Sequence, residues 1–584
     1  MSVFFQTGGR ATAPVSARAE SIWPNRYDLF VILILAGVLA GAALGARQMG
    51  RPLAALQVAP VSLDVANLPD YALLTTLRMF AAIAFSLLFT FVVGSLAAKS
   101  RKAELIIIPA LDILQSVPVL GFLTFTVIFF TGLFPGSQFG AELAAIFAIF
   151  TSQAWNMAFS FYQSLKTLPR NLDEAATHFR LSSWQRFWRL EAPFATPGLV
   201  WNTMMSMSGG WFFVVASEAI SVGDTKIALP GIGSYLSVAI DQKDIAAVGW
   251  AVLAMAIVIL LYDQLLFRPI VAWSDKFRME QTAAQAKPKS WAYDLLRRTR
   301  ILKRIAQALG VVGDALNRLS SLGSQSAPRV ALPDPARRGL DYLWLAIVAA
   351  GLAWAVWMII AYVRQSLGLS DLVEALIGAG FTLLRVVILI AIASVIWVPI
   401  GVWIGLRPAW AQGVQPLAQF LAAFPANVLF PFFVVLIAAF QLSPNIWLSP
   451  LMVLGTQWYI LFNVIAGASA FPTDLREAAS LYGVRRWQWW RKVILPGVFP
   501  YYVTGALTAS GGSWNASIVA EVASWGDTKL EATGLGAYIA KATDAGDFQR
   551  VTLGIVVMSF FVILFNRAVW RRLYVFAERK LRLD

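Results

Sequence analysis

The sequence predicts an all-α polytopic membrane protein with about twelve transmembrane helices, arranged as two parallel six-helix repeats. The first observation is composition: 58% of the 584 residues are hydrophobic and only 14% are charged, which is more apolar than a soluble domain needs to be. The second is a repeat, in which Glu174-Ala175-Ala176 returns 303 positions later as Glu477-Ala478-Ala479. A long repeat at a fixed offset indicates duplication of a whole domain.

Each expected span is an apolar run of about 20 residues or more, the length of helix that crosses a bilayer. Only structures that pair every backbone polar group internally can cross hydrocarbon, so these runs are expected to be helical. The spans of the first half are expected at 28–46, 72–98, 105–132, 140–163, 195–221 and 246–268. Those of the second half are expected at 340–362, 374–406, 415–441, 446–468, 498–523 and 550–571.

The spans divide the chain into two transmembrane domains, 28–270 and 339–584, with a cytoplasmic N-terminal tail over 1–27 and a basic cytoplasmic linker over 271–338. Within the linker, apolar residues at helical spacing follow a cluster of arginine and lysine. They are Ile301, Ile305, Leu309, Val312, Leu316 and Leu319. This pattern predicts an amphipathic helix on the inner leaflet or on the protein itself. A tether between the halves is its favoured role, and regulation is the alternative.

Orientation follows from lysine and arginine, because loops rich in these residues stay cytoplasmic during insertion. They gather near both E-A-A segments, in the linker and at both chain ends, whereas the loop at 133–139 has no charge at all. Both termini of the multi-pass protein are therefore expected in the cytoplasm. The net charge of +15 then reflects membrane topology, and no nucleic-acid-binding module is visible.

Several kinds of chemistry are excluded by what the sequence lacks. With no cysteine and His178 as the single histidine, there is no cluster suited to a metal and no Ser-His catalytic arrangement. No phosphate-binding G-x4-G-K-[ST] loop is present, so the chain is not expected to hydrolyse ATP by itself. The sequence therefore predicts a non-catalytic protein that binds no cofactor of its own.

The repeat extends into the membrane. At the offset of 303, Trp211 matches Trp514 and Glu218 matches Glu521, and each glutamate precedes a Gly-Asp-Thr-Lys segment; near an offset of 307, Arg78 matches Arg385. Equal helix number and equal orientation make the halves parallel repeats about an axis along the membrane normal. Such an arrangement places a solute path between them.

The second polar segment has the spacing E-A-A, three residues, Gly483, nine residues, Val493, one residue, Leu495-Pro496. It resembles the loop by which permease subunits of bacterial ABC importers hold their ATPases. The whole chain is similar to a fused pair of binding-protein-dependent transport permease domains of the type I importer fold. The second-helix arginines and the Trp-rich fifth helices look most like the nitrate, sulfonate, taurine and bicarbonate branch.

The resemblance implies that the coupling residues are Glu174, Ala175, Ala176, Glu477, Ala478, Ala479 and Gly483. It implies two cytoplasmic ATPase subunits, which bind ATP and Mg, and an extracytoplasmic substrate-binding protein. The expected function is ATP-driven import of a small anion across the bacterial plasma (inner) membrane, by alternating access between the halves. Nitrate, taurine, bicarbonate and an aromatic carboxylate are all left open. The alternative is a secondary transporter or channel driven by an ion gradient, which has no use for twin docking loops.

The first copy departs from the pattern, because Arg180 stands where the second copy has Gly483. Glycine adopts positive φ without steric cost, so a differently shaped bend is expected at Arg180 and the two docking surfaces are expected to be inequivalent.

Charged side chains inside spans are costly and need an explanation. The favoured interpretation is structural: two ion pairs, Arg78 with Glu218 and Arg385 with Glu521, tie helices together. In the alternative, the guanidinium groups line an anion path and bind oxyanions. The fifth helices carry Ser-Gly-Gly-Trp211 and Ser-Gly-Gly-Ser-Trp514-Asn515, for which cavity lining is slightly favoured over packing. The glycine-rich segments after them are expected to be outer loops that cap the cavity or receive a binding protein.

Overall fold

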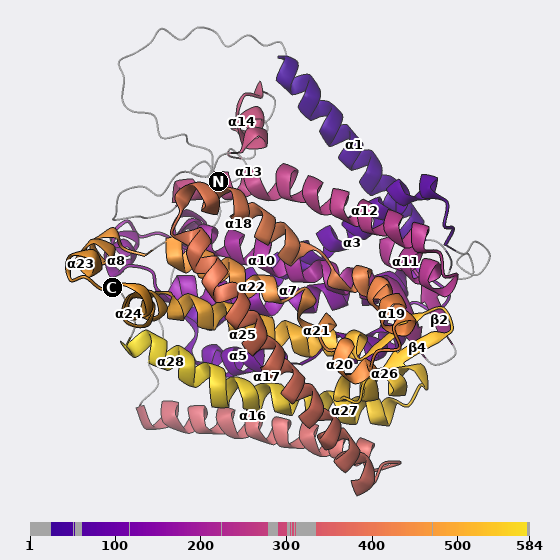
Figure 1. Cartoon of the computed structure of the whole chain (residues 1–584). Helices are drawn as coiled ribbons and strands as arrows, with labels where there is room; N and C mark the ends of the chain where they lie inside the picture. The colour runs from indigo at the N-terminus through magenta and orange to yellow at the C-terminus, as the bar shows by residue number, and fades with distance from the viewer. Residues whose placement is uncertain are drawn as a thin grey trace.

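The computed structural model describes residues 25–50, 52, 61–115, 117–222, 225–277, 290–300, 304, 307, 308, 310, 334–469 and 471–580, and it is mostly helical (Figure 1). Short 3-10 or π-helical turns are labelled η. The elements of the first half are α1 (Arg26–Met49), η2 (Val65–Asn67), α3 (Leu68–Phe89), η3 (Thr90–Gly94), α4 (Ser95–Lys99), α5 (Arg101–Leu114), α6 (Val119–Leu133), α7 (Gln138–Lys166), α8 (Arg170–His178), α9 (Ser183–Arg186), η4 (Phe187–Glu191), α10 (Ala192–Glu218), β1 (Ala219–Val222), β2 (Thr225–Ala228), α11 (Ile232–Asp241), α12 (Ile245–Tyr262), η5 (Asp263–Phe267), α13 (Arg268–Ser274), η6 (Asp275–Phe277) and α14 (Trp291–Arg297).

The second half repeats this order. Its elements are α16 (Asp334–Val363), α17 (Leu369–Gly405), α18 (Pro408–Ala423), η7 (Ala426–Leu429), α19 (Phe430–Ala439), α20 (Pro444–Trp447), α21 (Leu451–Leu454), α22 (Gln457–Ser469), α23 (Thr473–Leu481), α24 (Arg486–Trp489), η8 (Trp490–Ile494), α25 (Leu495–Ala520), β3 (Val522–Trp525), β4 (Thr528–Glu531), α26 (Leu535–Asp544), α27 (Phe548–Phe565), η9 (Asn566–Trp570) and α28 (Arg571–Lys580).

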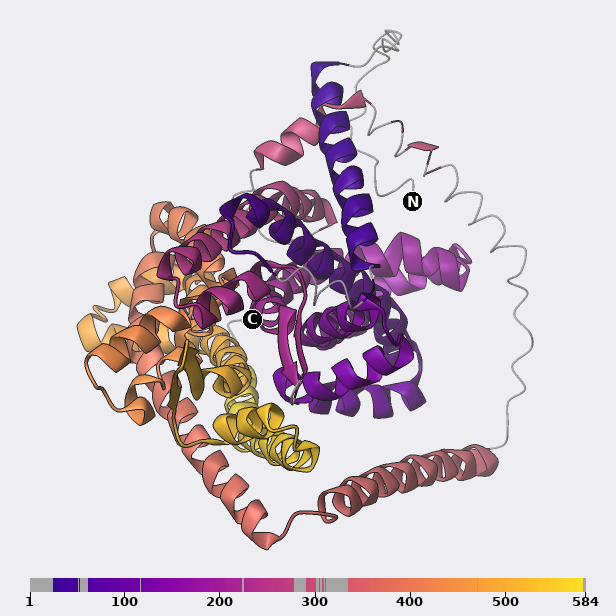
Figure 2. The ribbon, with the colours of Figure 1, turned by 90° about the vertical axis from the view of Figure 1, so that its right-hand side faces the viewer.

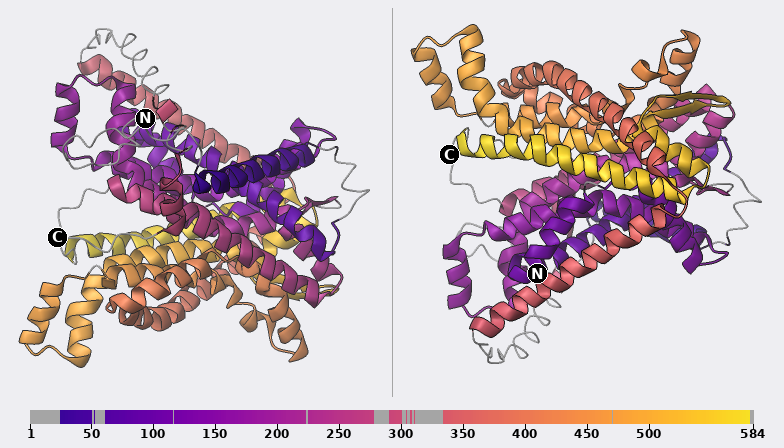
Figure 3. Two further views of the ribbon diagram at one scale, coloured as in Figure 1. Left: turned by 90° about the horizontal axis from the view of Figure 1, so that it is seen from above. Right: turned by 90° about the horizontal axis from the view of Figure 1, so that it is seen from below.

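The two halves lie side by side and point the same way. In Figure 1 the helices α8 and α23, which hold the E-A-A residues, lie at one end of the molecule, and the strands β2 and β4 lie at the other. Figure 3 shows the indigo-to-magenta half beside the orange-to-yellow half. The π-helical turns η4 and η8 also occupy equivalent places before the fifth helices. The prediction of two parallel all-α repeats is confirmed.

The predicted count of twelve spans is not confirmed. Among the described residues, eight helices are long and apolar enough to cross a membrane, or ten if two bent pairs are each one span. The expected span 415–441 bends by 77° between α18 and η7–α19, and 446–468 bends by 42° between α20–α21 and α22. The expected span 105–132 is divided between α5 and α6. The fifth span of the first half is α10, which is rich in serine and glycine and is not one of the eight.

Proline explains the breaks of the two third spans. Pro118 precedes α6 with φ −67° and ψ 118°, and Pro425 precedes η7 with φ −70° and ψ 106°, so both adopt an extended conformation. Proline has no N–H to continue a helical ladder, and it disfavours helical geometry in the residue before it. The apolar run therefore continues through each break although the helix does not.

The outer segments after the fifth helices are β-hairpins, where the sequence analysis expected only loops. Strands β1 and β2 pair antiparallel with Ala219 opposite Ala228, and β3 and β4 pair with Val522 opposite Glu531. Gly526 has φ +56° at the tip of the second hairpin, a conformation that favours glycine. Each hairpin leads into a short helix, α11 or α26.

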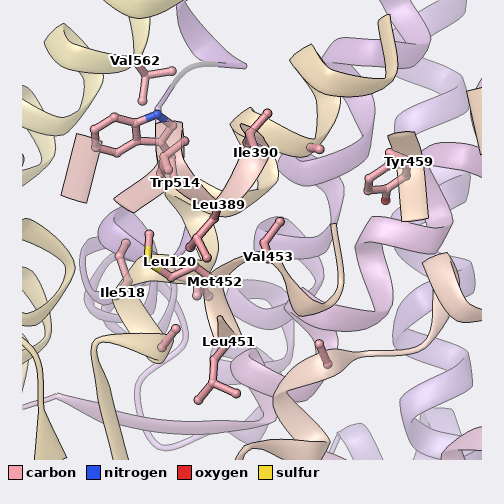
Figure 4. Packing of buried hydrophobic residues seen from close by; sticks show 14 of the residues in the cluster. Leu120, Leu389, Ile390, Leu451, Met452, Val453, Tyr459, Trp514, Ile518 and Val562 are labelled. Carbon is pink, nitrogen blue, oxygen red and sulfur yellow. The ribbon is translucent and has the colours of Figure 1, made fainter. Parts of the chain in front are cut away.

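The third elements contact both halves: α6 packs on α7 of its own half and α18 on α22 of its own half, and each also reaches the other half. Helix α6 of the first half packs on α25, α26 and α27, and α18 with η7 of the second half packs on α10 and α12. A Cβ at Gly121 in α6 would lie 2.8 Å from Ile555 of α27. Leu120 joins Leu389, Met452 and Trp514 in one buried cluster (Figure 4). The core of the second half therefore contains part of the first.

The first helix of each half is peripheral. Helix α16 packs against α27, and nearly all of its described side chains are exposed apolar groups (Figure 2). The predicted linker stripe from Ile301 to Leu319 lies outside the described residues. The part of the linker just before it contacts α1: the Arg300 N–H donates to Asp28 at 2.7 Å, and the Asn25 amide donates to the Arg298 carbonyl at 2.9 Å.

We expect Gly405→Leu to destabilise the protein, because a Cβ at Gly405 would lie 2.6 Å from the Ala468 Cβ and 2.7 Å from the Ile465 carbonyl oxygen of α22. Overpacking of this kind costs about 1–3 kcal/mol. Gly380→Leu, on the same helix, is the control, because a Cβ there meets nothing within 4 Å. Thermal unfolding midpoints in detergent measure both effects. Equal midpoints for the two variants would contradict the close approach of α17 and α22.

Candidate functional site

The E-A-A residues lie on short helices that project from the bundle at one end (Figure 1). In both copies the glutamate, Glu174 or Glu477, is exposed, the first alanine is half-buried, and the second alanine, Ala176 or Ala479, is buried. The small alanines face the body of the protein and let the short helix lie close to it. The carboxylates are left on the outer surface, where a partner can reach them.

The expectation of a different bend at Arg180 is wrong. Arg180 has φ +50° and Gly483 has φ +63°, so the chain takes the same left-handed turn after both helices. The same hydrogen bonds close the turn: Leu181 N–H donates to the Ala176 carbonyl at 3.1 Å, and Val484 N–H to the Ala479 carbonyl at 2.9 Å. This is the common helix C-terminal motif, whose bonds offset the modest cost of a non-glycine residue there. The turn itself therefore does not distinguish the two loops, which differ in backbone only further on, where Arg486 has φ +52° at the start of α24 and Ser183 is helical.

Apolar side chains project from the loop tips. In the first loop Phe179 is 75% exposed, and in the second its counterpart Tyr482 is 86% exposed. The neighbouring Leu481 and Trp487 are also largely exposed, and Trp184 is partly so. An exposed apolar patch of this kind at the end of a projecting segment is suited to contact with another protein or with a membrane.

The loops do differ in what holds them to the bundle. In the first, Arg186 pairs with Asp173 and with Glu191, and Lys99 pairs with Glu191 at 2.7 Å. In the second, the positions of Asp173, Arg186 and Glu191 are occupied by Arg476, Trp489 and Ile494. Ile494 is fully buried. One loop is thus attached by an ionic network and the other by apolar packing.

At the other end, Arg78 of α3 lies in a fully buried ionic cluster. Its guanidinium donates twice to Glu142 of α7, at 2.6 and 2.7 Å, and once to Glu218 at the end of α10, at 2.7 Å. A fourth bond reaches the Pro230 carbonyl at 3.0 Å. The side chains of Arg78 and Glu218 are 0% exposed and that of Glu142 is 1% exposed. The predicted contact of Arg78 with Glu218 is present.

The turn between β2 and α11 covers this cluster. The Gly233 N–H donates to Glu218 at 2.7 Å, and the Ile232 N–H donates to the Thr75 hydroxyl at 3.0 Å. A Cβ at Gly231 would collide with the Glu218 carboxylate, and one at Gly233 with the Val215 carbonyl. The glycines of the repeated G-x-G motif are therefore needed because the backbone passes directly over the carboxylate.

The second half builds a related cluster with one charge fewer. Arg385 donates to Glu521 at 3.0 Å, to the Thr533 carbonyl at 2.8 Å and to Asn445 at 3.1 Å. Thr382 also donates to Glu521, at 2.8 Å. The predicted contact of Arg385 with Glu521 is present. Asn445 stands 303 positions after Glu142, so an amide replaces the second carboxylate.

Sequence reasoning missed Glu142, Asn445 and the two threonines. A usable signal was present, because Glu142 is an acidic residue inside an expected span and matches Asn445 at the repeat offset. Thr75 and Thr382 are separated by 307 residues, as are Arg78 and Arg385. Applying the offset to every polar residue in the spans would have assembled both clusters.

A cavity of about 70 Å³ lies between the halves. The first half contributes Ser208, Gly209, Phe212 and Phe213 of α10. The second half contributes residues of α18, α21, α22 and α25 and of the breaks between them, among them Phe424, Thr456, Tyr459 and Gly512. The expected serine-glycine motifs of the fifth helices thus reach this cavity from both sides.

The other pathway candidates do not line it. Trp211 and Trp514 are both 1% exposed, and Trp211 packs edge-on against Tyr262 at a ring distance of 5.8 Å. Asn515 accepts a hydrogen bond from the Val119 N–H at 2.8 Å and so caps α6 of the other half. Arg78, Arg385, Glu218 and Glu521 are absent from the lining of this cavity.

A separate contact joins the halves at the hairpin end. The Gly526 N–H of the second hairpin donates to the Ile240 carbonyl of α11 at 3.0 Å, and Lys243 pairs with Asp527 at 2.8 Å. The hydrogen bond and the charge of Lys243 lower the pKa of the exposed Asp527 carboxyl.

The comparisons agree with this duplicated architecture. The family model for the binding-protein-dependent transport system inner membrane component matches residues 67–268 and 397–582. The nitrate import permease NrtB of Leptolyngbya laminosa is 28% identical over 188 residues, which are 32% of this chain and 64% of that protein. The bicarbonate transport permease CmpB of Synechococcus elongatus is 27% identical over 179 residues, 31% of this chain and 61% of CmpB. The taurine transport permease TauC of Escherichia coli is 26% identical over 196 residues, 33% of this chain and 67% of TauC.

The chain thus spans 64% and 61% of the length of the first two of these relatives. The two family matches fall one in each half and leave out α1, the linker, α16 and most of α17. The predicted fused permease is therefore confirmed, and the chain belongs to the family of binding-protein-dependent transport system inner membrane components and carries its domain twice.

Proposed function

We propose that this chain is the complete membrane-spanning component of an ATP-driven ABC importer for a small oxyanion-bearing solute. The observation that carries the proposal is the pair of projecting E-A-A loops, which have the same backbone turn and exposed apolar tips. Each permease domain binds one ATPase subunit, so a chain with two permease domains binds two ATPase subunits. The relatives named for nitrate, bicarbonate and taurine transport support the class of solute.

In this proposal the E-A-A end faces the cytoplasm and both termini lie there. ATP and Mg bind to the ATPase subunits, and the chain itself performs no catalysis. The hairpin end faces outward and receives a substrate-binding protein. Residues 28–270 and 339–584 form the two transmembrane domains, and 271–338 connect them on the cytoplasmic side. The positive-inside distribution of lysine and arginine supports this orientation.

Transport follows from rigid-body motion of the halves. Closure of two ATPases moves the projecting loops toward each other, and the loops move the helices that they join. The cavity between the halves is lined by residues of both, so rocking of one half against the other changes the end at which it opens. An ion-driven carrier, the alternative, explains the duplicated fold but gives no role to the two exposed loop tips.

The buried arginines serve as anchors in this proposal, not as an anion path. Arg78 has no exposed surface and makes four hydrogen bonds to protein oxygens. An anion would have to displace a carboxylate from each guanidinium in order to bind. The two clusters instead hold the second and fifth helices of each half to the outer turn.

We expect Phe179→Ser and Tyr482→Ser each to weaken binding of a co-expressed ABC ATPase about tenfold, or ~1.4 kcal/mol, because each removes an apolar anchor at a loop tip. Phe440→Ser is the matched control: Phe440 is 70% exposed and follows α19, which packs on β3 at the opposite end. Titration of the ATPase against the full chain in detergent measures the affinities. Equal loss in all three variants, or none in any, would exclude these tips as the ATPase contact.

We expect Arg78→Gln to cost more stability than Arg385→Gln. Loss of Arg78 leaves two buried carboxyl groups, Glu142 and Glu218, without their cation, whereas loss of Arg385 leaves only one, and the Arg385 side chain is itself 11% exposed. Breaking a buried ion pair costs about 3–5 kcal/mol.

Gel filtration and unfolding midpoints in detergent check this order. Combining Arg78→Gln with Glu142→Gln and Glu218→Gln should recover part of the loss, because no buried charge then remains unpaired. If both arginine variants fold like the unchanged chain and only transport is lost, the arginines belong to an anion path.

A further inference from the structure

We propose that the tip of the second hairpin and the end of α11 form a latch that holds the two halves together at the hairpin end, and that this latch opens when solute enters from that end. The latch consists of Ile240, Lys243, Gly526 and Asp527. The inference rests on the proposed function, because it names a contact that rocking of the halves has to break. Helix α11 belongs to the first half and the hairpin β3–β4 to the second.

The latch contains two polar contacts between the halves. The Gly526 N–H donates to the Ile240 carbonyl at 3.0 Å, and the Lys243 ammonium pairs with the Asp527 carboxylate at 2.8 Å. The Ile240 carbonyl also accepts from the Lys243 N–H of its own half, at 3.1 Å. Both contacts join the same short turn to the same hairpin tip, so separation of the halves at this end breaks both.

The hairpin tip fits closely against the lysine. Gly526 has φ +56°, and a Cβ there would collide with the Lys243 side chain. Glycine is therefore needed at this tip for two reasons: it takes the left-handed conformation without steric cost, and it leaves room for the lysine of the other half. Asp527, the next residue, then meets the end of that lysine.

Apolar contacts accompany the latch. Trp525, directly before the hairpin tip, packs against the buried clusters of both halves. Leu229, directly after β2 of the first half, is fully buried in the cluster that holds most of the second half's core. Figure 3 shows the halves meeting at the hairpin end, whereas the purple α8 and the orange α23 lie on opposite sides of the molecule. The structure therefore has its halves closed together at the end that the latch joins.

The latch is built on one side only. At the repeat offset of 303, Lys243 corresponds to Gly546, and Asp527 corresponds to Asp224. Lys243 has φ +57° and Gly546 has φ +68°, so α11 and α26 end in the same left-handed turn. The turn after α26 nevertheless offers no cation at this position. Asp224 itself lies outside the described residues. Lysine therefore replaces the favoured glycine in only one of two equivalent turns, and there it pairs with the other half.

The polar contacts are weak enough to break in every transport cycle. The Lys243 side chain is 46% exposed and that of Asp527 is 97% exposed, so water and salt reach the pair. An exposed ion pair changes an equilibrium by a factor of about five or less, and one hydrogen bond by about tenfold or less. The latch therefore biases the halves toward contact at the hairpin end without fixing them there.

Distances between spin labels on the full chain in lipid nanodiscs, without ATPases, test the bias. The chain contains no cysteine, so labels at Ala246→Cys and Ala545→Cys, both exposed and in opposite halves, are the only ones. We expect Lys243→Ala and Asp527→Ala each to raise the ratio of long to short distances about fivefold, the limit for one exposed ion pair. Combining Lys243→Asp with Asp527→Lys should return the ratio to within about twofold of the unchanged chain, because the pair is restored with its charges exchanged.

Lys529→Ala is the matched control. Lys529 lies on the same hairpin, but its ion pair with Asp544 stays within the second half, so the ratio should not change. Gel filtration checks that each variant is folded. An equal ratio in Lys243→Ala, Asp527→Ala and Lys529→Ala would overturn the latch, and so would a rise in Lys529→Ala as large as in the other two.

A disulfide between Lys243→Cys and Asp527→Cys tests whether the latch has to open. In the complex with co-expressed ATPases, oxidation should lower ATP hydrolysis at least tenfold and a reductant should restore it, whereas a disulfide between Lys529→Cys and Asp544→Cys should change nothing. Hydrolysis at the full rate in the cross-linked chain would overturn this part of the proposal. If no ATPase binds the unchanged chain, the importer function fails, and the spin-label distances alone decide the latch.

Discussion

A guanidinium buried away from water must be paired on nearly every side, and this requirement organises the outer end of each half. Arg78 draws the second, fourth and fifth helices and the Pro230 carbonyl to one point. Once Glu218 is fixed there, the turn that follows must pass over its carboxylate, which only glycine at positions 231 and 233 permits. The hairpin and α11 take their positions from this turn. The ionic cluster around Arg78 thus determines the geometry of the hairpin end of this half.

Rigid outer ends limit where the two halves can move relative to each other. Helix α6 of the first half also contacts the second half, and α18 with η7 of the second half also contacts the first. Asn515 of the second half caps α6. Helix α6 begins directly after Pro118, and Pro425 lies at the break between α18 and η7. A broken helix can change its angle at the break without losing hydrogen bonds elsewhere. The break at Pro425 also brings Phe424 to the wall of the cavity between the halves.

The sequence predicted the repeat, the parallel orientation of the two halves and both arginine–glutamate pairs. These features could be predicted because the two halves keep the same residue types at a constant offset although most other residues differ. It did not predict the broken spans, since hydropathy reports how apolar a run is and not whether its backbone is helical. Arg180 was misjudged for a related reason. Residue type makes positive φ unfavourable there, but the hydrogen bonds of the helix end decide the conformation. The cavity lay beyond prediction because it depends on which side of each helix faces the other half.

Duplication within one chain also explains why the halves are unequal. In a symmetric dimer of one gene product, every substitution appears on both sides of the axis. Here Glu142 in the first half corresponds to Asn445 in the second, and the positions of Asp173, Arg186 and Glu191 in the first E-A-A loop are occupied by Arg476, Trp489 and Ile494 in the second. Exposed ion pairs contribute little to the stability of the fold, and salt screens them. Glu191 is only 3% exposed, so salt screens its pairs with Lys99 and Arg186 less. The cavity wall is unequal as well, with Tyr459 opposite a glycine of α10. A solute between the halves therefore meets different side chains on its two sides, whereas a symmetric dimer of one permease domain would present the same side chains on both.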